Sequence, residues 1–387
     1  MHTITNKSAT VKIEPIQAYL NTLADPRDAR GRQHPLTAIM NLCCVALLTG
    51  AKTPCAIARW WRNRPEDQKP AILARLGFTR PYGPSQATLY RVLAAINIDR
   101  LEAALQAWAE AQLQGDPPDK DELEGVAIDG KTLRGARKQA AELTQLLSAF
   151  SQRLGLTLSQ RAVASQTNEI GQMPDLLADL RLKGCVFTMD ALHTQRQTAQ
   201  TIVEREGDYV MILKANQTTM YQDLEVLFSE GDVAALIADQ ATTLNKGHGR
   251  IERRRLQTST AMNDFLDWPG LNQVFRIERY RTATKTGQTQ HEASFGLTSL
   301  TTQQANATTM LQVVRGHWHI ENRSHWVRDV TFGEDASQLR TGYLPQVMAA
   351  LRNWVIGLIR LLPFRFIPEG LDYLTARPLE ALELIGC

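Results

Sequence analysis

Two short apolar runs that each end in an aspartate constrain the fold of this chain more than any other feature. Residues 124–128 lead directly to Asp129, and residues 183–189 lead directly to Asp190. An apolar run bounded by glycine and charge is typical of a buried strand, and ligands of open α/β sheets gather beyond the carboxyl ends of the strands. Either aspartate alone could be an ordinary turn residue. Two such strands, however, could bring paired carboxylates together.

The elements around these runs follow a recognisable order. Three strands, a helix, a strand, a helix and a strand, followed by a further helix, are the pattern of the ribonuclease H fold, with the aspartates at the ends of its first and fourth strands. The neighbouring position of those two strands is a property of that fold and not of the sequence. The expected strands are 125–128, 144–151, 156–165, 185–189 and 208–214, and the expected helices are 170–182, 194–206 (N-cap Thr194) and 218–228.

Residues 1–114 are expected to form a separate all-α domain, because prolines repeatedly interrupt helical sequence. A polar, proline-rich connector follows it at 115–121. Ser85 is suited to cap a short helix that exposes Arg91, much like the recognition helix of a helix-turn-helix. Arg59 lies in a segment that mixes three arginines with two tryptophans and could contact phosphates. Amphipathic packing helices with solvated arginines are the alternative for both segments.

Residues 231–303 interrupt the α/β pattern between a first part of the core at 122–230 and its completion at 304–387. The interruption alternates apolar and charged residues, which predicts half-exposed strands. Between Lys246 and Lys285 it carries nine Lys or Arg against four acids, a surplus of five. We therefore expect a basic, β-rich insertion whose Arg250 and Arg253 contact phosphates. A solvated strand face is the alternative.

A helix expected from residue 308 to 329 would supply a third carboxylate. Its apolar spacing buries one face, and Glu321 lies one turn from His317 and two turns from Arg328, so all three could line one edge. Two further carboxylates, Glu334 and Asp335, compete for the role of Glu321. A zinc site is a further alternative, because the sequence holds His317, His319, His325 and His193. In a helix, however, His317 and His319 would point to different sides.

Composition sets wider limits. A chain of 387 residues can hold two or three domains, and a net charge of +3 permits a nucleic-acid partner without requiring one. The five cysteines lack a CxxC or His-spaced pattern and are expected to be buried thiols of a cytosolic protein. No secretory signal opens the sequence, and the apolar segment 36–50 is too short to span a bilayer. The apolar helix expected at 347–362 is better suited to packing than to membrane attachment.

With these residues identified, the chain resembles the DDE transposases of bacterial insertion sequences, specifically the ISAs type that includes the H-repeat-associated proteins. The similarity extends over nearly the whole chain, in motifs that occur in the expected order. They are Asp25-Pro-Arg, His34-Pro-Leu, the run to Trp60-Trp61, Ala127-Ile-Asp-Gly-Lys131, Thr167-Asn-Glu-Ile170, Met189-Asp-Ala-Leu-His-Thr-Gln195, His248-Gly-Arg-Ile-Glu252, Arg315-Gly-His-Trp-His-Ile-Glu-Asn322 and Phe332-Gly-Glu-Asp335.

The resemblance implies that Asp129, Asp190 and Glu321 form the catalytic, metal-binding triad. A carboxylate set without cysteine suits Mg²⁺, which Mn²⁺ could replace. The partners implied are double-stranded DNA, at the element's terminal inverted repeats and at the target, and a second copy of the chain when two ends are paired. The expected location is the bacterial cytoplasm, at the nucleoid when DNA is bound.

The sequence departs from the wider group at two places. The Tyr, Arg, Glu, Lys signature of that group is occupied here by Val314, His317, Glu321 and Arg328. Arg328 keeps the positive charge and, with Lys131, Arg134 and His317, is a candidate for phosphate contact. Two other functions stay open at this point: an inactive or domesticated DNA-binding protein, and a metal-dependent nuclease that cuts without joining.

Overall fold

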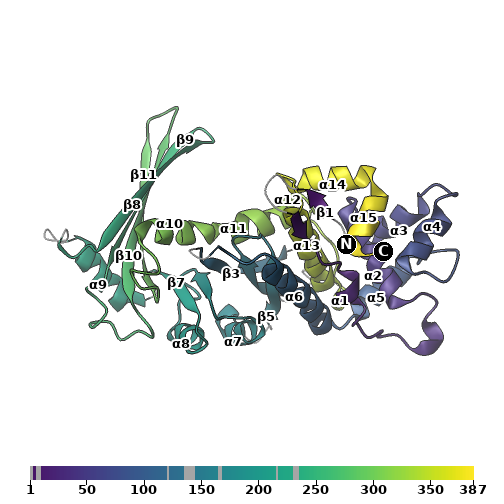
Figure 1. Cartoon of the computed structure of the whole chain (residues 1–387), viewed down its shortest axis with the longest axis horizontal. Helices are drawn as coiled ribbons and strands as arrows, with labels where there is room; N and C mark the ends of the chain where they lie inside the picture. Colours follow the sequence, from purple (N-terminus) through teal and green to yellow (C-terminus); the bar gives the residue numbers. More distant parts are fainter. Residues whose placement is uncertain are drawn as a thin grey trace. The chain divides into compact units, whose positions relative to one another are not determined.

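The computed structural model describes residues 3–5, 10–119, 122–134, 144–163, 168–214, 217–229 and 235–387. The chain divides into two compact units. The first comprises Met1–Lys120, Gly130–Gln166 and Glu321–Cys387, and the second comprises Asp121–Asp129 and Thr167–Ile320. Both units are therefore built from segments far apart in the sequence (Figure 1).

The second unit is organised around parallel strands that form the middle of a mixed sheet. β3 (Glu124–Leu133) pairs in parallel with β6 (Cys185–Met189), which pairs in parallel with β7 (Asp208–Leu213). The full hydrogen-bonded order is β5 (Thr157–Val163), β4 (Thr144–Ser151), β3, β6, β7, β11 (Thr289–Thr298), β10 (Gln273–Ala283), β9 (Arg250–Ser259) and β8 (Asp239–Gly247). Its first five strands have the order expected for a ribonuclease H-like core, and β3 and β6, which carry the two aspartates, are neighbours. The predicted fold class is confirmed.

Apolar helix faces cover this sheet. The helices are α7 (Glu169–Asp179), α8 (Arg196–Glu204), α9 (Thr218–Ser229) and α10 (Ala307–Gly316). A core cluster joins Leu256 and Phe275 of the sheet to Met310 of α10. At Gly296 the strand passes so close to the Phe275 ring and the Met211 carbonyl that a Cβ atom would have no room. Glycine is therefore required by packing at that position.

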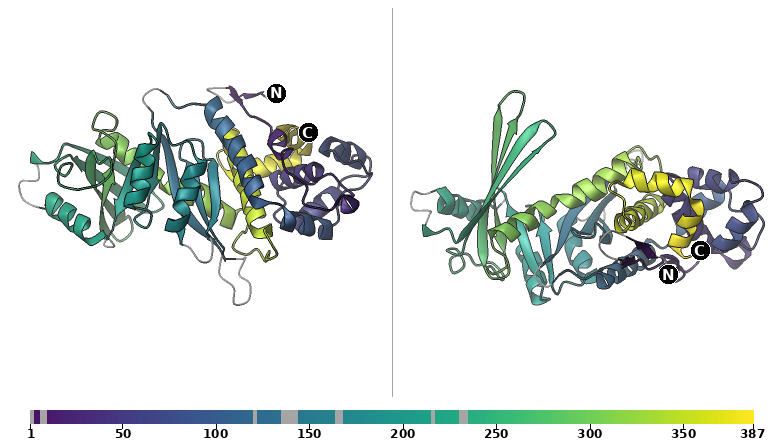
Figure 2. Two further views of the ribbon diagram at one scale, coloured as in Figure 1. Left: turned by 90° about the horizontal axis from the view of Figure 1, so that it is seen from below. Right: turned by 45° about the horizontal axis from the view of Figure 1, so that its top comes forward.

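The predicted β-rich insertion is an antiparallel arm at one side of the sheet. Its strands are β8 (Asp239–Gly247), β9 (Arg250–Ser259), β10 (Gln273–Ala283) and β11 (Thr289–Thr298). β11 pairs with β7, so the arm continues the sheet of the same unit. In Figure 2, right, the strands extend beyond α10, and their distal residues are largely exposed. Exposed basic side chains, among them Arg250 and Arg253, are thereby presented on a hydrogen-bonded sheet.

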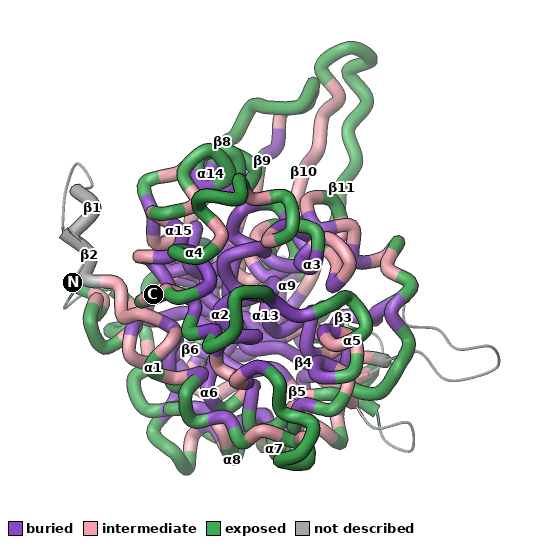
Figure 3. The backbone as a smooth tube through the Cα atoms, turned by 90° about the vertical axis from the view of Figure 1, so that its right-hand side faces the viewer, coloured by how far each residue is buried: buried purple, intermediate pink, exposed green. Residues whose placement is uncertain are grey.

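The first unit is mainly helical. Its longest helices, α6 (Ile98–Gly115) and α13 (Leu344–Leu361), pack on each other, and almost every residue of α13 is buried, as expected for residues 347–362 (Figure 3). Within the described ranges no helix is long and apolar enough to cross a membrane. The remaining elements are β1 (Thr3–Thr5), β2 (Thr10–Lys12), α1 (Gln17–Leu20), η1 (Ala29–Gly31), α2 (Leu36–Leu48), α3 (Pro54–Arg62), α4 (Lys69–Leu76), α5 (Gln86–Ala95), β4 (Thr144–Ser151), β5 (Thr157–Val163), α12 (Trp326–Val330), α14 (Ile367–Ala376) and α15 (Pro378–Ile385).

Two details differ from the sequence-based expectation. Helix α8 begins at Arg196 after Gln195, because the Thr194 hydroxyl donates instead to the carbonyl oxygens of Asp190 and Ile212, at 3.0 and 2.6 Å. The single helix expected over 308–329 is divided into α10, α11 (Trp318–Ile320), a π-helical turn over Glu321–His325 and α12. The expected end of strand 156–165 and Thr167 lie outside the described residues.

Candidate catalytic site

Asp129 and Asp190 lie at equivalent positions of adjacent parallel strands. Ile128 of β3 is the register partner of Met189, the last residue of β6. Asp129 is the next residue of β3, and Asp190 directly follows β6. Paired positions of neighbouring strands lie about 5 Å apart, with their side chains on the same face. Both aspartates are half-buried. The second unit thus brings together the two carboxylates that sequence analysis placed at strand ends.

A turn at the end of β6 fixes the orientation of Asp190. Its Oδ1 accepts the backbone N–H groups of Leu192, at 3.1 Å, and His193, at 3.3 Å. Its own carbonyl accepts the Thr194 hydroxyl. Asp190 Oδ1 is therefore held in place by backbone donors that an asparagine could also satisfy.

A side-chain contact that the sequence did not reveal supports this turn. His193 is only 1% exposed, and its Nε2 lies 3.0 Å from Oε2 of Glu169 on α7. Glu169 belongs to the Thr167–Ile170 motif and His193 to the motif that contains Asp190. The only sign of this contact in the sequence is that each of the two motifs contains one of the residues. Their separation along the chain does not show that they meet. We infer that Glu169 positions His193 and, through it, the Asp190 turn.

His317 lies beside the strand that ends at Asp190, and its ring is not positively charged. Its Nδ1 is 3.0 Å from the Thr188 hydroxyl, on the strand that ends at Asp190. Burial lowers the pKa of His317 to about 4, although the nearby Asp190 carboxylate acts in the opposite direction. The ring is therefore neutral at physiological pH, and a charge-based phosphate contact by His317 has no support in this arrangement.

Glu321 and Arg328 do not share the edge that a regular helix would give them. Seven residues of α-helix complete nearly two turns, which would place both side chains on one face. Glu321 instead opens a π-helical turn, whose wider winding shifts the register of the residues after it. Glu321 is exposed, whereas Arg328 is 0% exposed. Arg328 is thus not at the surface where the predicted phosphate contact would be made.

Several other candidate residues of the first unit have partners of their own. Lys131 is buried, and its Nζ donates to both carboxylate oxygens of Asp329 at 2.8 and 2.7 Å. Glu334 is 4% exposed and accepts from two arginines. A carboxylate already held by two guanidinium groups is a poor candidate for the third metal ligand. Arg134 is exposed and lies 3.9 Å from Asp335.

The arm presents Arg250 and Arg253 as exposed side chains. The guanidinium of Arg253 lies over the Tyr280 ring at 4.5 Å, and that ring stacks on His291 at 4.4 Å. The three residues are register partners on β9, β10 and β11, so they form one row across one face of the arm. Two arginines of the opposite face are instead held by the buried Glu252, namely Arg254 and Arg279.

The helical region of the first unit places its two candidate cations at the surface. Arg91 is exposed on α5, whose first turn is capped by Ser85 accepting the Thr88 N–H at 3.2 Å, as predicted. Arg59 is exposed on α3, which contacts α5. Trp61 of α3 donates its Nε1–H to the carbonyl of Pro84 at 3.1 Å, which fixes the approach to α5.

The donor chemistry of this edge suits a hard divalent cation, because Asp129 and Asp190 offer only carboxylate oxygens. Among the described residues, no cluster of three or more His, Cys, Asp or Glu side chains could hold a metal ion. Within those ranges, neither the histidines considered for zinc nor the set of Asp129, Asp190 and Glu321 forms such a cluster. His193 in particular is engaged by Glu169.

Two protein families match parts of this chain. The family described as "Transposase DDE domain" matches residues 120–356, and the family described as "DDE_Tnp_1-associated" matches residues 17–109. A synaptic complex of piggyBac transposase with hairpin DNA aligns with a TM-score of 0.40 and 8% identity, over 95% of this chain and 78% of that one.

Three relatives align with this chain over most of their length. "Uncharacterized protein in dhlA 3'region" of Xanthobacter autotrophicus is 33% identical, over 68% of this chain and 88% of that protein. "Putative transposase YncI" of Escherichia coli O157:H7 is 26% identical, over 90% and 88%. "H repeat-associated putative transposase YhhI" of Escherichia coli K12 is 25% identical, over 90% and 91%. The resemblance to H-repeat-associated transposases is confirmed, and this chain belongs to the transposase DDE domain family.

Proposed function

We propose that this chain is a DDE transposase that binds the ends of its insertion sequence and catalyses metal-dependent strand cleavage and strand transfer. The observation that carries the proposal is the register of β3 and β6, which sets Asp129 and Asp190 side by side. Paired carboxylates at the carboxyl edge of a parallel sheet are suited to hold cations that act on phosphodiesters. Membership in the family supports the same chemistry.

Asp129, Asp190 and Glu321 are the residues that would hold the metal. Mg²⁺, or Mn²⁺ in its place, would supply activation of the attacking oxygen and stabilisation of the leaving oxygen. The chain's own part is to present the carboxylates in fixed orientations. The backbone donors of Leu192 and His193 do so for Asp190, and the π-helical turn exposes Glu321.

Two surfaces would bind DNA. On the arm, Arg253 and Arg250 are exposed, and Tyr280 holds the Arg253 guanidinium from one side, which limits its freedom before a phosphate arrives. In the helical region, Arg91 on α5 and Arg59 on α3 would contact the duplex. We also propose that two copies act together when two ends are paired, in the bacterial cytoplasm.

The test uses labelled duplexes that carry the element's own ends, incubated with Mg²⁺ or EDTA. Asp129→Asn, Asp190→Asn and Glu321→Gln should each abolish cleavage and joining while binding of the ends persists. Asp264→Asn and Glu225→Gln, exposed acids of the second unit, are matched controls that should stay active.

Other outcomes separate the alternatives. Cleavage without a joined product would identify a nuclease. End binding without metal-dependent cleavage by the wild type would identify an inactive DNA-binding protein. Activity of Glu321→Gln together with an inactive Glu334→Gln variant would move the third carboxylate to Glu334.

A further inference from the structure

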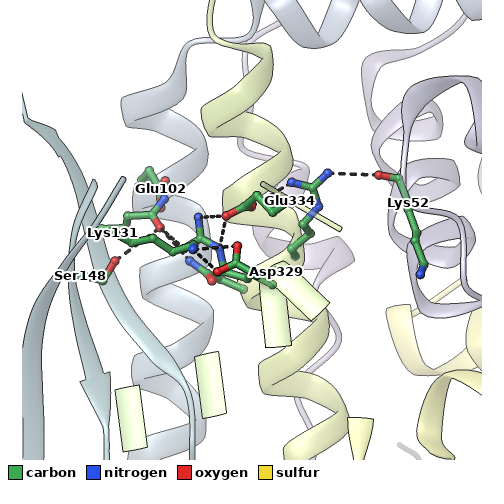
Figure 4. Close-up of polar contacts among 10 residues, drawn as sticks. Lys52, Glu102, Lys131, Ser148, Asp329 and Glu334 are labelled. Atoms are coloured by element: carbon green, nitrogen blue, oxygen red, sulfur yellow. Dashed lines mark hydrogen bonds and ion pairs between the residues drawn. The ribbon is translucent and has the colours of Figure 1, made fainter. Parts of the chain in front are cut away.

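Three buried charged side chains form one ion-paired group in the first unit. Arg328 Nη2 lies 2.7 Å from Glu334 Oε1, and Arg352 Nη1 lies 2.9 Å from Glu334 Oε2. Their exposures are 0% for Arg328, 4% for Glu334 and 2% for Arg352. Figure 4 shows Glu334 at the centre of these contacts. We call the three residues the Arg–Glu–Arg cluster.

The cluster is stable only as a unit. Burial alone would raise the pKa of Glu334, but the two guanidinium groups hold it below its usual value. Burial lowers the pKa of Arg352, and the Glu334 carboxylate opposes that shift. Removal of one member would leave an uncompensated charge in a site with little access to water, which is strongly unfavourable.

The contacts of the cluster reach several elements of the first unit. Arg328 Nη1 donates to Gln160 Oε1 of β5 at 3.3 Å, and Gln160 in turn donates to Glu102 of α6 at 2.8 Å. Arg352 of α13 donates to the Lys52 carbonyl, before α3, at 3.1 Å. Arg328 of α12 is thereby linked directly to β5, through Gln160 to α6, and through Glu334 to Arg352 of α13.

A second ion pair attaches α12 to β3. Lys131 Nζ binds both oxygens of Asp329, the residue after Arg328. Lys131 follows Asp129 by two positions along the same strand. Adjacent residues of α12 are therefore fixed by two buried or half-buried cation–carboxylate contacts, and both contacts lie within the first unit.

The π-helical turn connects this anchored helix to Glu321. Without the turn, Arg328 would project within about 20° of Glu321 around the helix axis. With it, Glu321 is exposed while Arg328 is completely buried. A π turn is a strained, uncommon winding that needs support from its surroundings. Within the turn, Arg323 donates to the Gln152 carbonyl at 3.0 Å, and after the turn Arg328 is buried and paired with Glu334.

We propose that the Arg–Glu–Arg cluster positions Glu321: by holding Arg328 inward, it maintains the register of the π-helical turn that presents the carboxylate. The proposal rests on the proposed function in that Glu321 is taken as a metal ligand. It assigns Arg328 a positioning role instead of a phosphate contact, and it assigns Glu334 to the support of the third carboxylate instead of to the metal itself.

The variants are Arg328→Gln and Glu334→Gln, with Arg328→Lys as a milder change that keeps the charge. Arg27→Gln is the matched control, because Arg27 is a half-buried arginine of the same unit that pairs with Asp25 at 2.6 Å and donates to the His34 carbonyl. Three quantities are measured: hydrogen exchange of the amides of residues 321–330, Mn²⁺ affinity by calorimetry, and the Mg²⁺ concentration that gives half-maximal cleavage.

In both glutamine variants we expect faster exchange over 321–330 and metal affinity weaker by on the order of tenfold, as for other residues that orient metal ligands. End binding should be unchanged. Arg328→Lys should be intermediate, and it keeps the test valid if Arg328→Gln does not fold. Arg27→Gln should match the wild type in all three measurements.

Three results would overturn the proposal. The Arg328→Gln protein could be folded and less stable, with unchanged hydrogen exchange and unchanged metal affinity. The cluster would then only stabilise the fold and would not position Glu321. Weaker end binding with unchanged metal affinity would make Arg328 a DNA contact. Normal exchange with complete loss of metal binding in Glu334→Gln would make Glu334 a ligand. If the wild type neither binds metal nor cleaves DNA, the proposed function fails, while the exchange measurement still decides whether the cluster holds the turn.

Discussion

Replacing Asp190 by asparagine should stabilise the metal-free protein. Asp129 and Asp190 directly follow a register pair of β3 and β6, and neighbouring strands lie about 5 Å apart, which we take as the spacing of the two carboxylates. Two negative charges at that distance repel by about 3 kcal/mol at an effective dielectric constant of 20 and by about 0.8 kcal/mol in bulk water. Because both side chains are half-buried, we expect Asp190→Asn to raise the free energy of unfolding by about 1–2 kcal/mol. The amide oxygen can still accept the Leu192 and His193 N–H groups, so the turn is kept.

The assay is urea unfolding in EDTA and in excess Mg²⁺. A metal present at ten times its dissociation constant stabilises the wild type by about 1.4 kcal/mol, and Asp190→Asn should lose most of that gain. Asp264→Asn, an exposed acid of the same unit, should show the wild-type response to Mg²⁺. If Asp190→Asn were destabilised in EDTA and still stabilised by Mg²⁺, the paired-carboxylate reasoning would be refuted.

Two further predictions concern the first unit. Burial raises the pKa of Glu102 from 4.5 to about 8, so between these values the folded protein retains a proton that the unfolded chain releases, and stability falls as pH rises, by at most about 5 kcal/mol. Glu102→Gln should flatten this fall when urea unfolding is compared at about pH 5 and about pH 8.5, and an unchanged slope would exclude Glu102 as its source. Ser85→Ala should cost about 1 kcal/mol of stability by removing the bond to the Thr88 N–H, whereas Ser85→Asp, which can also cap, should keep most of it. Equal unfolding of all three proteins would show that the cap contributes nothing.

Much of the fold could be predicted, because the apolar runs of the sequence coincide with the strands that are buried in the sheet. The apolar run before Asp190 is β6 to the residue, and the run before Asp129 lies within β3. All of β6 is buried, so its sequence is continuously apolar and Asp190 marks its end. β3 differs from the expectation, because it continues past Asp129 to Leu133. The neighbouring position of the strands was not a local property. It required knowledge of the ribonuclease H order.

The contacts that support the site could not be predicted, because they join residues whose sequence separation carries no period. Glu169 and His193 are such a pair, and the buried group of Arg328, Glu334 and Arg352 is another. Sequence reasoning assumed an uninterrupted helix over 308–329 and therefore gave Arg328 the same face as Glu321. The widened turn at Glu321 changes the outcome for every residue after it, because a single additional residue per turn moves a side chain from the surface to the interior.

The same turn explains why Arg328, which stands at the Lys position of the family signature, is buried instead of exposed. A guanidinium that is 0% exposed needs a buried carboxylate, and Glu334 in the motif that follows supplies one. The positive charge of Arg328 and the negative charge of Glu334 are therefore best understood together, as one buried pair whose members stand six residues apart. On this argument, a substitution at either position should be tolerated only with a compensating change at the other, since each alone would leave a buried charge unpaired.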